Sequence, residues 1–68
     1  MLNQKLRELS KLGYILIVED GECKITERET GEVELTFSSQ EKSDTKEWLV
    51  QKFCFKKKDE LAELAKEN

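Results

Sequence analysis

The dipeptide Asp20-Gly21 constrains the fold of this chain most, because it lies between two segments that favour β-structure. Asp-Gly is a strong signal for a two-residue type I′ turn, which joins antiparallel strands. Residues 14–18 before it are all apolar, and residues 23–28 after it begin with alternating apolar and polar side chains. A two-residue loop predicts a hairpin with one face pairing Tyr14 with Glu27, Leu16 with Ile25 and Val18 with Cys23. The other face pairs Ile15 with Thr26 and Ile17 with Lys24.

A second turn signal, Arg28-Glu29-Thr30-Gly31-Glu32, fits a type I turn followed by a glycine bulge. That loop predicts the outward-facing pairs Arg28–Glu32, Thr26–Glu34 and Lys24–Thr36. On the other face it predicts the pairs Ile25–Leu35 and Cys23–Phe37. Both hairpins place Cys23 and Ile25 on the same face, so the two registers agree. The sequence therefore predicts a three-stranded antiparallel meander.

Helical patterns flank the predicted sheet. Leucines recur at helical spacing in residues 2–12, and Gly13 follows where a left-handed C-terminal cap would lie. Residues 44–47 read Asp-Thr-Lys-Glu, a capping-box pattern before an apolar run, which predicts a helix over about residues 44–55. Alternation within residues 49–55 also permits a fourth strand. A further helix is predicted to begin with Asp59 as its N-cap.

These elements predict one α+β domain over residues 1–68, in the order αβββαα. It consists of a three-stranded antiparallel meander with an N-terminal helix and one or two C-terminal helices. A domain of this length buries only about 60% of the surface that its unfolded chain exposes, so its core is small. The longest continuous apolar run, residues 14–18, is far shorter than a membrane span, and we expect no membrane contact.

Negative charge is concentrated in the middle of the chain, where residues 19–47 carry ten acidic and four basic side chains. The register predicts that Arg28 opposite Glu32, and Lys24 diagonal to Glu34, neutralise the outer sheet face. The remaining acids fall at the two turns: Glu19, Asp20 and Glu22 at one, and Glu27, Glu29 and Glu32 at the other. These turns lie roughly 20 Å apart along a six-residue strand. The acids either solvate the turns or form two poles that bind a basic surface of a partner protein.

Two other features are candidate binding surfaces. Ile15 and Ile17 face away from the side of the sheet that carries Leu16. Either the helices sandwich both faces of the sheet, or these isoleucines contact another molecule, as in a homodimer. Lys56, Lys57 and Lys58 are next to two phenylalanines, a pattern that either binds nucleic acid or forms a solvated helix junction. A net charge of −3 makes nucleic acid the less favoured partner. We expect Trp48 to anchor the core.

The sequence lacks the residues and motifs that several kinds of functional site require. The chain has no histidine, the commonest general base and metal ligand. Cys23 and Cys54, without histidine, do not form the usual structural zinc site, and the acidic turn at 19–22 is too short for a calcium loop. Neither glycine-rich phosphate-binding motif occurs. We therefore expect a non-enzymatic protein with no cofactor and no metal. Two free, buried thiols in a cytoplasmic protein are favoured over a disulfide.

Two protein families resemble this sequence in the order of their elements. Residues 22–50, with Glu-Thr-Gly-Glu, then Thr-Phe-Ser, then Lys-Glu-Trp-Leu, resemble the arm-type DNA-binding domain of tyrosine integrases, which implies a three-stranded sheet that lies on DNA. In that family's sheet, bases stand where this chain has Glu32 and Glu34. The whole chain also resembles small phage anti-CRISPR proteins in size, element order and charge. Some of those inhibitors occupy the DNA-binding surface of a nuclease with carboxylates.

The leading functional prediction is a small protein-binding module, which inhibits or modulates a nucleic-acid-handling partner through its acidic turns. The partner-binding candidates are Asp20, Glu22, Glu27, Glu29, Glu32, Ile15 and Ile17. One alternative is a nucleic-acid-binding regulator that uses the sheet and Lys56–Lys58. Another is a homodimeric adaptor joined through Ile15 and Ile17.

Overall fold

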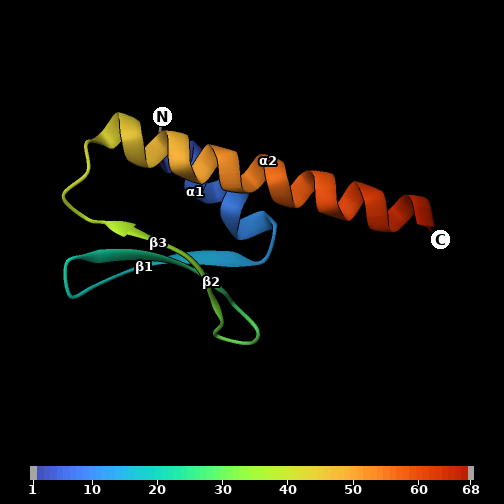
Figure 1. Cartoon of the computed structure of the whole chain (residues 1–68), viewed down its shortest axis with the longest axis horizontal. Helices are drawn as coiled ribbons and strands as arrows, with labels where there is room; N and C mark the ends of the chain where they lie inside the picture. The colour runs from blue at the N-terminus through green and yellow to red at the C-terminus, as the bar shows by residue number, and fades with distance from the viewer. Residues whose placement is uncertain (1, 68) are drawn as a thin grey trace.

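The structure, a computed structural model, describes residues 2–67 and has two layers, one of helices and one of strands (Figure 1). Within these residues, two helices and one three-stranded sheet form the fold, which confirms the predicted α+β class. In chain order the elements are α1 (Leu2–Lys11), β1 (Tyr14–Glu19), β2 (Glu22–Glu27), β3 (Val33–Ser38) and α2 (Ser43–Glu67).

The first hairpin has the predicted turn and register. Asp20 and Gly21 both have left-handed backbone angles, with φ of 52° and 74°, as a type I′ turn requires. The three pairs predicted for the face that carries Leu16 and the two predicted for the other face are all present. The turn chemistry of two residues therefore determines which side chains of β1 and β2 face the core.

The second hairpin departs from the predicted register at its loop. The pairs Ile25–Leu35 and Cys23–Phe37 are confirmed, but Thr26 pairs with Val33 instead of Glu34. The Glu27 amide donates to the Glu32 carbonyl at 2.8 Å, so residues 28–31 form a loop one residue longer than predicted. Arg28 is therefore not paired with Glu32. A bulge at Glu34 absorbs the extra residue and restores the register of the rest of β3.

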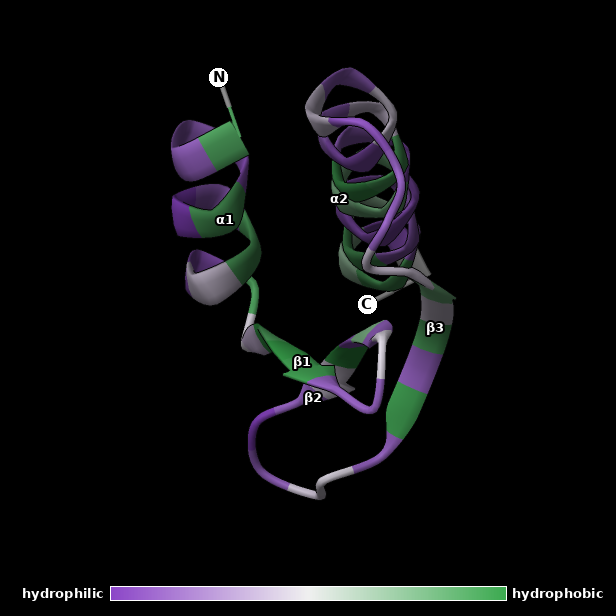
Figure 2. Cartoon of the chain, turned by 90° about the vertical axis from the view of Figure 1, so that its left-hand side faces the viewer, coloured by the Kyte–Doolittle hydropathy of each residue, from purple (hydrophilic) through white to green (hydrophobic). Residues whose placement is uncertain are grey.

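Both helices lie on the same face of the sheet (Figures 1 and 2). The alternative in which helices sandwich the sheet is therefore wrong, and the opposite face carries no helix among the described residues. α1 packs against α2 and β1, and together the layers bury a small apolar core. The buried apolar side chains are Leu9, Cys23, Ile25, Val50, Phe53 and Cys54. The two cysteines are free, as predicted.

A single helix of 25 residues, α2, replaces the two helices predicted for the C-terminal part. The alternative fourth strand is also wrong, because Val50, Phe53 and Cys54 are buried at the i, i+3, i+4 spacing of one helix face. No proline interrupts the chain, and Asp59 lies inside the helix instead of capping a new one. The last turns of α2 project beyond the sheet (Figure 1), and residues 58–66 are all exposed.

Truncating a leucine should lower the free energy of unfolding more in the core than on the projecting end of α2. Leu9 is 1% exposed in the core, whereas Leu61 on the projecting part of α2 is 53% exposed. We expect Leu9→Ala to lower the free energy of unfolding by about 2–5 kcal/mol, because it leaves a cavity between α1 and its neighbours. The matched control, Leu61→Ala, is expected to cost less than about 1 kcal/mol. Urea unfolding followed by far-ultraviolet circular dichroism checks both, and equal losses would contradict the position of the core.

Candidate functional site

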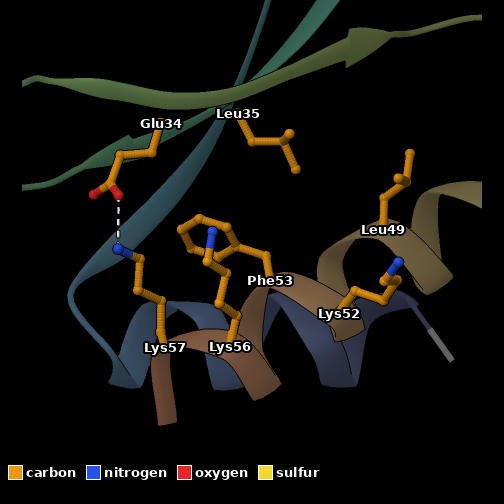
Figure 3. A pocket seen from close by; sticks show the side chains of 7 residues that line it. All are labelled: Glu34, Leu35, Leu49, Lys52, Phe53, Lys56 and Lys57. Atoms are coloured by element: carbon orange, nitrogen blue, oxygen red, sulfur yellow. Dashed lines mark ion pairs between the residues drawn. The ribbon is translucent and has the colours of Figure 1, made fainter. Parts of the chain in front are cut away.

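An ion pair joins α2 to the bulge of β3. The Lys57 ammonium lies 2.7 Å from a carboxylate oxygen of Glu34 and 3.2 Å from one of Glu60. It also lies 5.6 Å and 5.5 Å from the ring centroids of Tyr14 and Phe53, which contact each other edge to face at 5.1 Å. The bulge turns Glu34 toward α2, where it faces Lys57 (Figure 3). Tyr14 adds β1 to this cluster.

The electrostatics of the cluster follow from this geometry. The hydrogen bond from Lys57 is the main cause that lowers the pKa of Glu34, and it outweighs the opposite effect of burial. The same contact is the main cause that raises the pKa of Lys57. Burial, followed by a hydrogen bond with Glu34, raises the pKa of Tyr14. Glu34 and Lys57 are therefore both charged at neutral pH and stabilise the folded state as a pair.

A groove of about 330 Å³ lies next to this cluster, between β3 and α2 (Figure 3). Its apolar lining is made of Leu35, Leu49 and Phe53. Lys52, Lys56 and Lys57 supply positive charge, and Glu34 supplies the one acidic side chain of the lining. The sequence predicts Glu34 on the outer sheet face and gives no signal for a role of Lys52. The bulge and the continuity of α2, neither visible as a motif, create the groove.

The predicted acidic turns lie at opposite ends of the sheet (Figure 1). Glu19, Asp20 and Glu22 are exposed at the β1–β2 turn, as are Glu29 and Glu32 at the β2–β3 loop. Glu27 is partly buried at the start of that loop and accepts a hydrogen bond from the Thr30 hydroxyl at 3.2 Å. The structure thus brings the acids together within each turn and keeps the two turns apart.

The two bases predicted to neutralise the outer sheet face, Arg28 and Lys24, form other contacts. Arg28 donates to the carbonyl of Ser10 at 2.6 Å and to its hydroxyl at 2.9 Å, so it ties the β2–β3 loop to the end of α1. Lys24 lies 3.9 Å from Glu19 instead of beside Glu34. Because Arg28 is not opposite Glu32, the β2–β3 loop has more negative charge without a nearby base than the predicted pairs would leave.

The sheet face turned away from the helices carries an apolar row. Ile15, Thr26 and Val33 are partners in register across β1, β2 and β3. Ile15 is 39% exposed and Val33 is 47% exposed, while Thr26 between them is buried. Ile17, the other predicted contact, lies in the next row of β1 and is partly buried. The row lies at the end of the sheet next to the β2–β3 loop, so its exposed apolar surface borders the acids of that loop and is farther from the β1–β2 turn.

The three consecutive lysines do not form one surface. Lys57 is held by Glu34, whereas Lys58 lies 3.9 Å from Glu8 of α1 and 6.0 Å from the ring of Phe55. Lys56 lines the groove. The helix junction expected at these residues is absent, since α2 continues through them. Trp48 is 55% exposed, with the Lys52 ammonium 4.4 Å from its ring, so the expectation that it anchors the core is wrong.

Comparisons with known proteins found no relative: no family model matches the chain, and no curated protein or solved structure is significantly similar to it. Within residues 2–67 no helix is long and apolar enough to cross a membrane. In the same range, no cluster of three or more histidine, cysteine or acidic side chains is arranged to hold a metal ion.

The ion pair predicts an acid-dependent loss of stability. The folded-state pKa of Glu34 lies below its unfolded value, so its contribution is present above about pH 4.5 and is lost as pH falls through the folded pKa. We expect Glu34→Gln to lower the free energy of unfolding by about 1 kcal/mol at pH 7, because solvent partly screens the pair, and by clearly less near pH 3.

Glu32→Gln is the matched control, because Glu32 is exposed in the β2–β3 loop. Its effect should stay within about 0.5 kcal/mol at both pH values. Urea unfolding curves of the wild type and both variants at the two pH values check the prediction. A Glu34→Gln variant that behaves like the control would show that the ion pair does not stabilise the fold.

Proposed function

We propose that the chain is a small, non-enzymatic protein-binding module, which docks the open face of its sheet on a basic surface of a partner protein. The observation that carries this proposal is exposed apolar surface on a sheet face that has no helix among the described residues, with acidic turns at both ends of the sheet. Stable protein interfaces have the same anatomy, with an apolar centre and a polar rim.

The apolar row supplies the centre of the proposed interface. Ile15 and Val33 expose 39% and 47% of their surface on the two sides of buried Thr26, next to the bulge of β3. Burying such surface contributes about 25 cal/mol for each Å² removed from water. The three strands hold the row without a loop that would have to be ordered on binding, which keeps the entropic cost low.

Charge selects the kind of partner. Residues 14–38, which form the sheet and its turns, carry seven acidic and two basic side chains, whereas residues 2–13 carry three bases and one acid. The negative charge is therefore concentrated in the sheet layer. Complementary charge steers association and rejects wrong partners. A surface that normally binds the phosphates of a nucleic acid has the required positive charge, so the module would compete with nucleic acid for that surface and inhibit its partner.

The sequence supports a binding role over catalysis because it has no histidine, the commonest general base. Cytoplasmic location is part of the proposal and is supported by two cysteines that stay unpaired and buried. A nucleic-acid-binding regulator based on Lys56–Lys58 gains less support, because these side chains contact different parts of the fold.

A charge-reversal experiment tests the proposal. Immobilised wild-type protein is expected to capture a partner from a lysate of the source organism, and added duplex DNA should reduce the capture. The double variant Glu22→Lys, Glu29→Lys reverses one exposed acid at each turn. We expect it to lower the captured amount at least about tenfold, because two complementary charges become repulsive.

The matched control is Asp59→Lys, Glu63→Lys, which reverses two exposed acids on α2. It has the same net charge as the turn variant and is expected to retain the partner. Undiminished capture by the turn variant would reject the acidic-turn mechanism.

Sedimentation of the wild type and of Ile15→Lys supplies a second check. A dimer that only the wild type forms would show that another copy of the chain covers the open sheet face.

A further inference from the structure

We propose that the groove between β3 and α2 is a second binding site, which accepts an extended peptide segment with an acid–x–acid pattern as an additional strand along β3. The site shares no side chain with the open sheet face or the acidic turns. Its existence therefore does not depend on the function proposed above.

The backbone of β3 offers the first half of the recognition. The strand order is β1-β2-β3, so β3 forms strand hydrogen bonds on one side only within the described chain. The free edge of such a strand presents amide and carbonyl groups that a further strand can pair with. Peptides bind many proteins by this mode, in which backbone bonds supply affinity and side-chain pockets supply specificity.

The groove supplies an apolar floor for such a peptide. Leu35 of β3 and Leu49 of α2 point into the space between strand and helix, with Phe53 beside them (Figure 3). The Cα atoms of α2 stay more than 8 Å from those of the strands among the described residues, so long side chains alone bridge the layers. A volume of about 330 Å³ falls at the lower end of the range of ligand pockets.

The positive charge of the groove lining favours an acidic occupant. Glu34 pairs with Lys57 at 2.7 Å, so the excess positive charge of the lining comes from Lys52 and Lys56. Both are exposed, and neither is within ion-pair distance of a carboxylate in the part of the chain that the structure describes. In a protein of net charge −3, this groove is a local basic site. Charged hydrogen bonds from two lysines fit two carboxylates of the occupant.

The spacing of the two lysines defines the pattern of acids. Lys52 and Lys56 are four residues apart in α2, which separates them by about 6 Å along the helix axis. Side chains on one face of an extended peptide repeat every second residue, at about 6.6 Å. Two acids separated by one residue therefore reach both lysines from the same face of the added strand.

A fluorescein-labelled peptide, Thr-Val-Glu-Val-Glu-Val-Thr, is the probe, and fluorescence polarisation at low ionic strength is the measurement. We expect saturable binding to the wild type. The variant Lys52→Glu, Lys56→Glu should weaken it at least about tenfold, since two attractions become repulsions. The control variant Lys11→Glu, Lys66→Glu changes two exposed lysines outside the groove and has the same net charge, and we expect less than about a threefold change. Circular dichroism verifies that both variants keep the wild-type fold.

Two modified peptides separate the parts of the mechanism. A peptide with glutamine in place of glutamate tests the acids, and a peptide with methylated backbone nitrogens tests the added strand. Both should bind at least about tenfold more weakly than the probe. Equal binding of either peptide, equal weakening by both lysine variants, or no binding of the probe to the wild type would each overturn the proposal.

Single-stranded nucleic acid is the competing occupant, because Trp48 and Phe55 are exposed beside the same lysines and bases stack on such rings. A labelled oligothymidylate is measured with the same variants. If it binds more tightly than the peptide and depends on Lys52 and Lys56, the proposal of an acidic peptide is wrong. Absence of such binding, together with peptide binding, supports it.

Discussion

The rest of the structure depends on one constraint: in the described residues, the buried core covers one face of the sheet. Two helices and three strands use nearly the whole chain, and both helices are needed on the same side to bury Leu9, Ile25 and Val50 together. No element is left for a third layer within the described residues. The open sheet face therefore follows from the two-layer packing, which leaves the apolar row uncovered among the described residues.

The contact between Glu34 and Lys57 marks the end of that core. Lys57 follows Val50, Phe53 and Cys54 on the buried stripe of α2, where an apolar side chain would continue the pattern. The bulge in β3 places a carboxylate opposite this lysine, so a charged residue is accommodated where the layers separate. The same pair removes one lysine and one glutamate from the charge balance of the groove. A structural contact thus determines which charges remain for binding.

The sequence allowed correct prediction where local chemistry decides the outcome. Asp20-Gly21 determined the turn, the register of β1 on β2 and the face of every side chain in both strands. The second hairpin was predicted less well, because a backbone hydrogen bond from the Glu27 amide to the Glu32 carbonyl sets the loop length, and almost any residue type can form such a bond. The side of the sheet that each helix covers and the groove beside β3 depend on contacts between distant segments, which no single-residue signal encodes. The candidate acids were located correctly at two turns, whereas Glu34 and Lys52 were not recognised because their positions follow from the bulge and from the uninterrupted helix.

The projecting end of α2 has a consequence for the motion of the protein. Up to Lys58 the helix is supported by the core and by ion pairs with β3 and α1, but residues 59–66 are exposed and rely mainly on helix propensity and local charge pairs. One continuous helix therefore contains two regions of different cooperativity. Its first half unfolds only with the whole domain, whereas its last turns open by fraying at a much smaller free-energy cost. Amide hydrogens along this single element should exchange with solvent at rates that rise toward its C-terminal end.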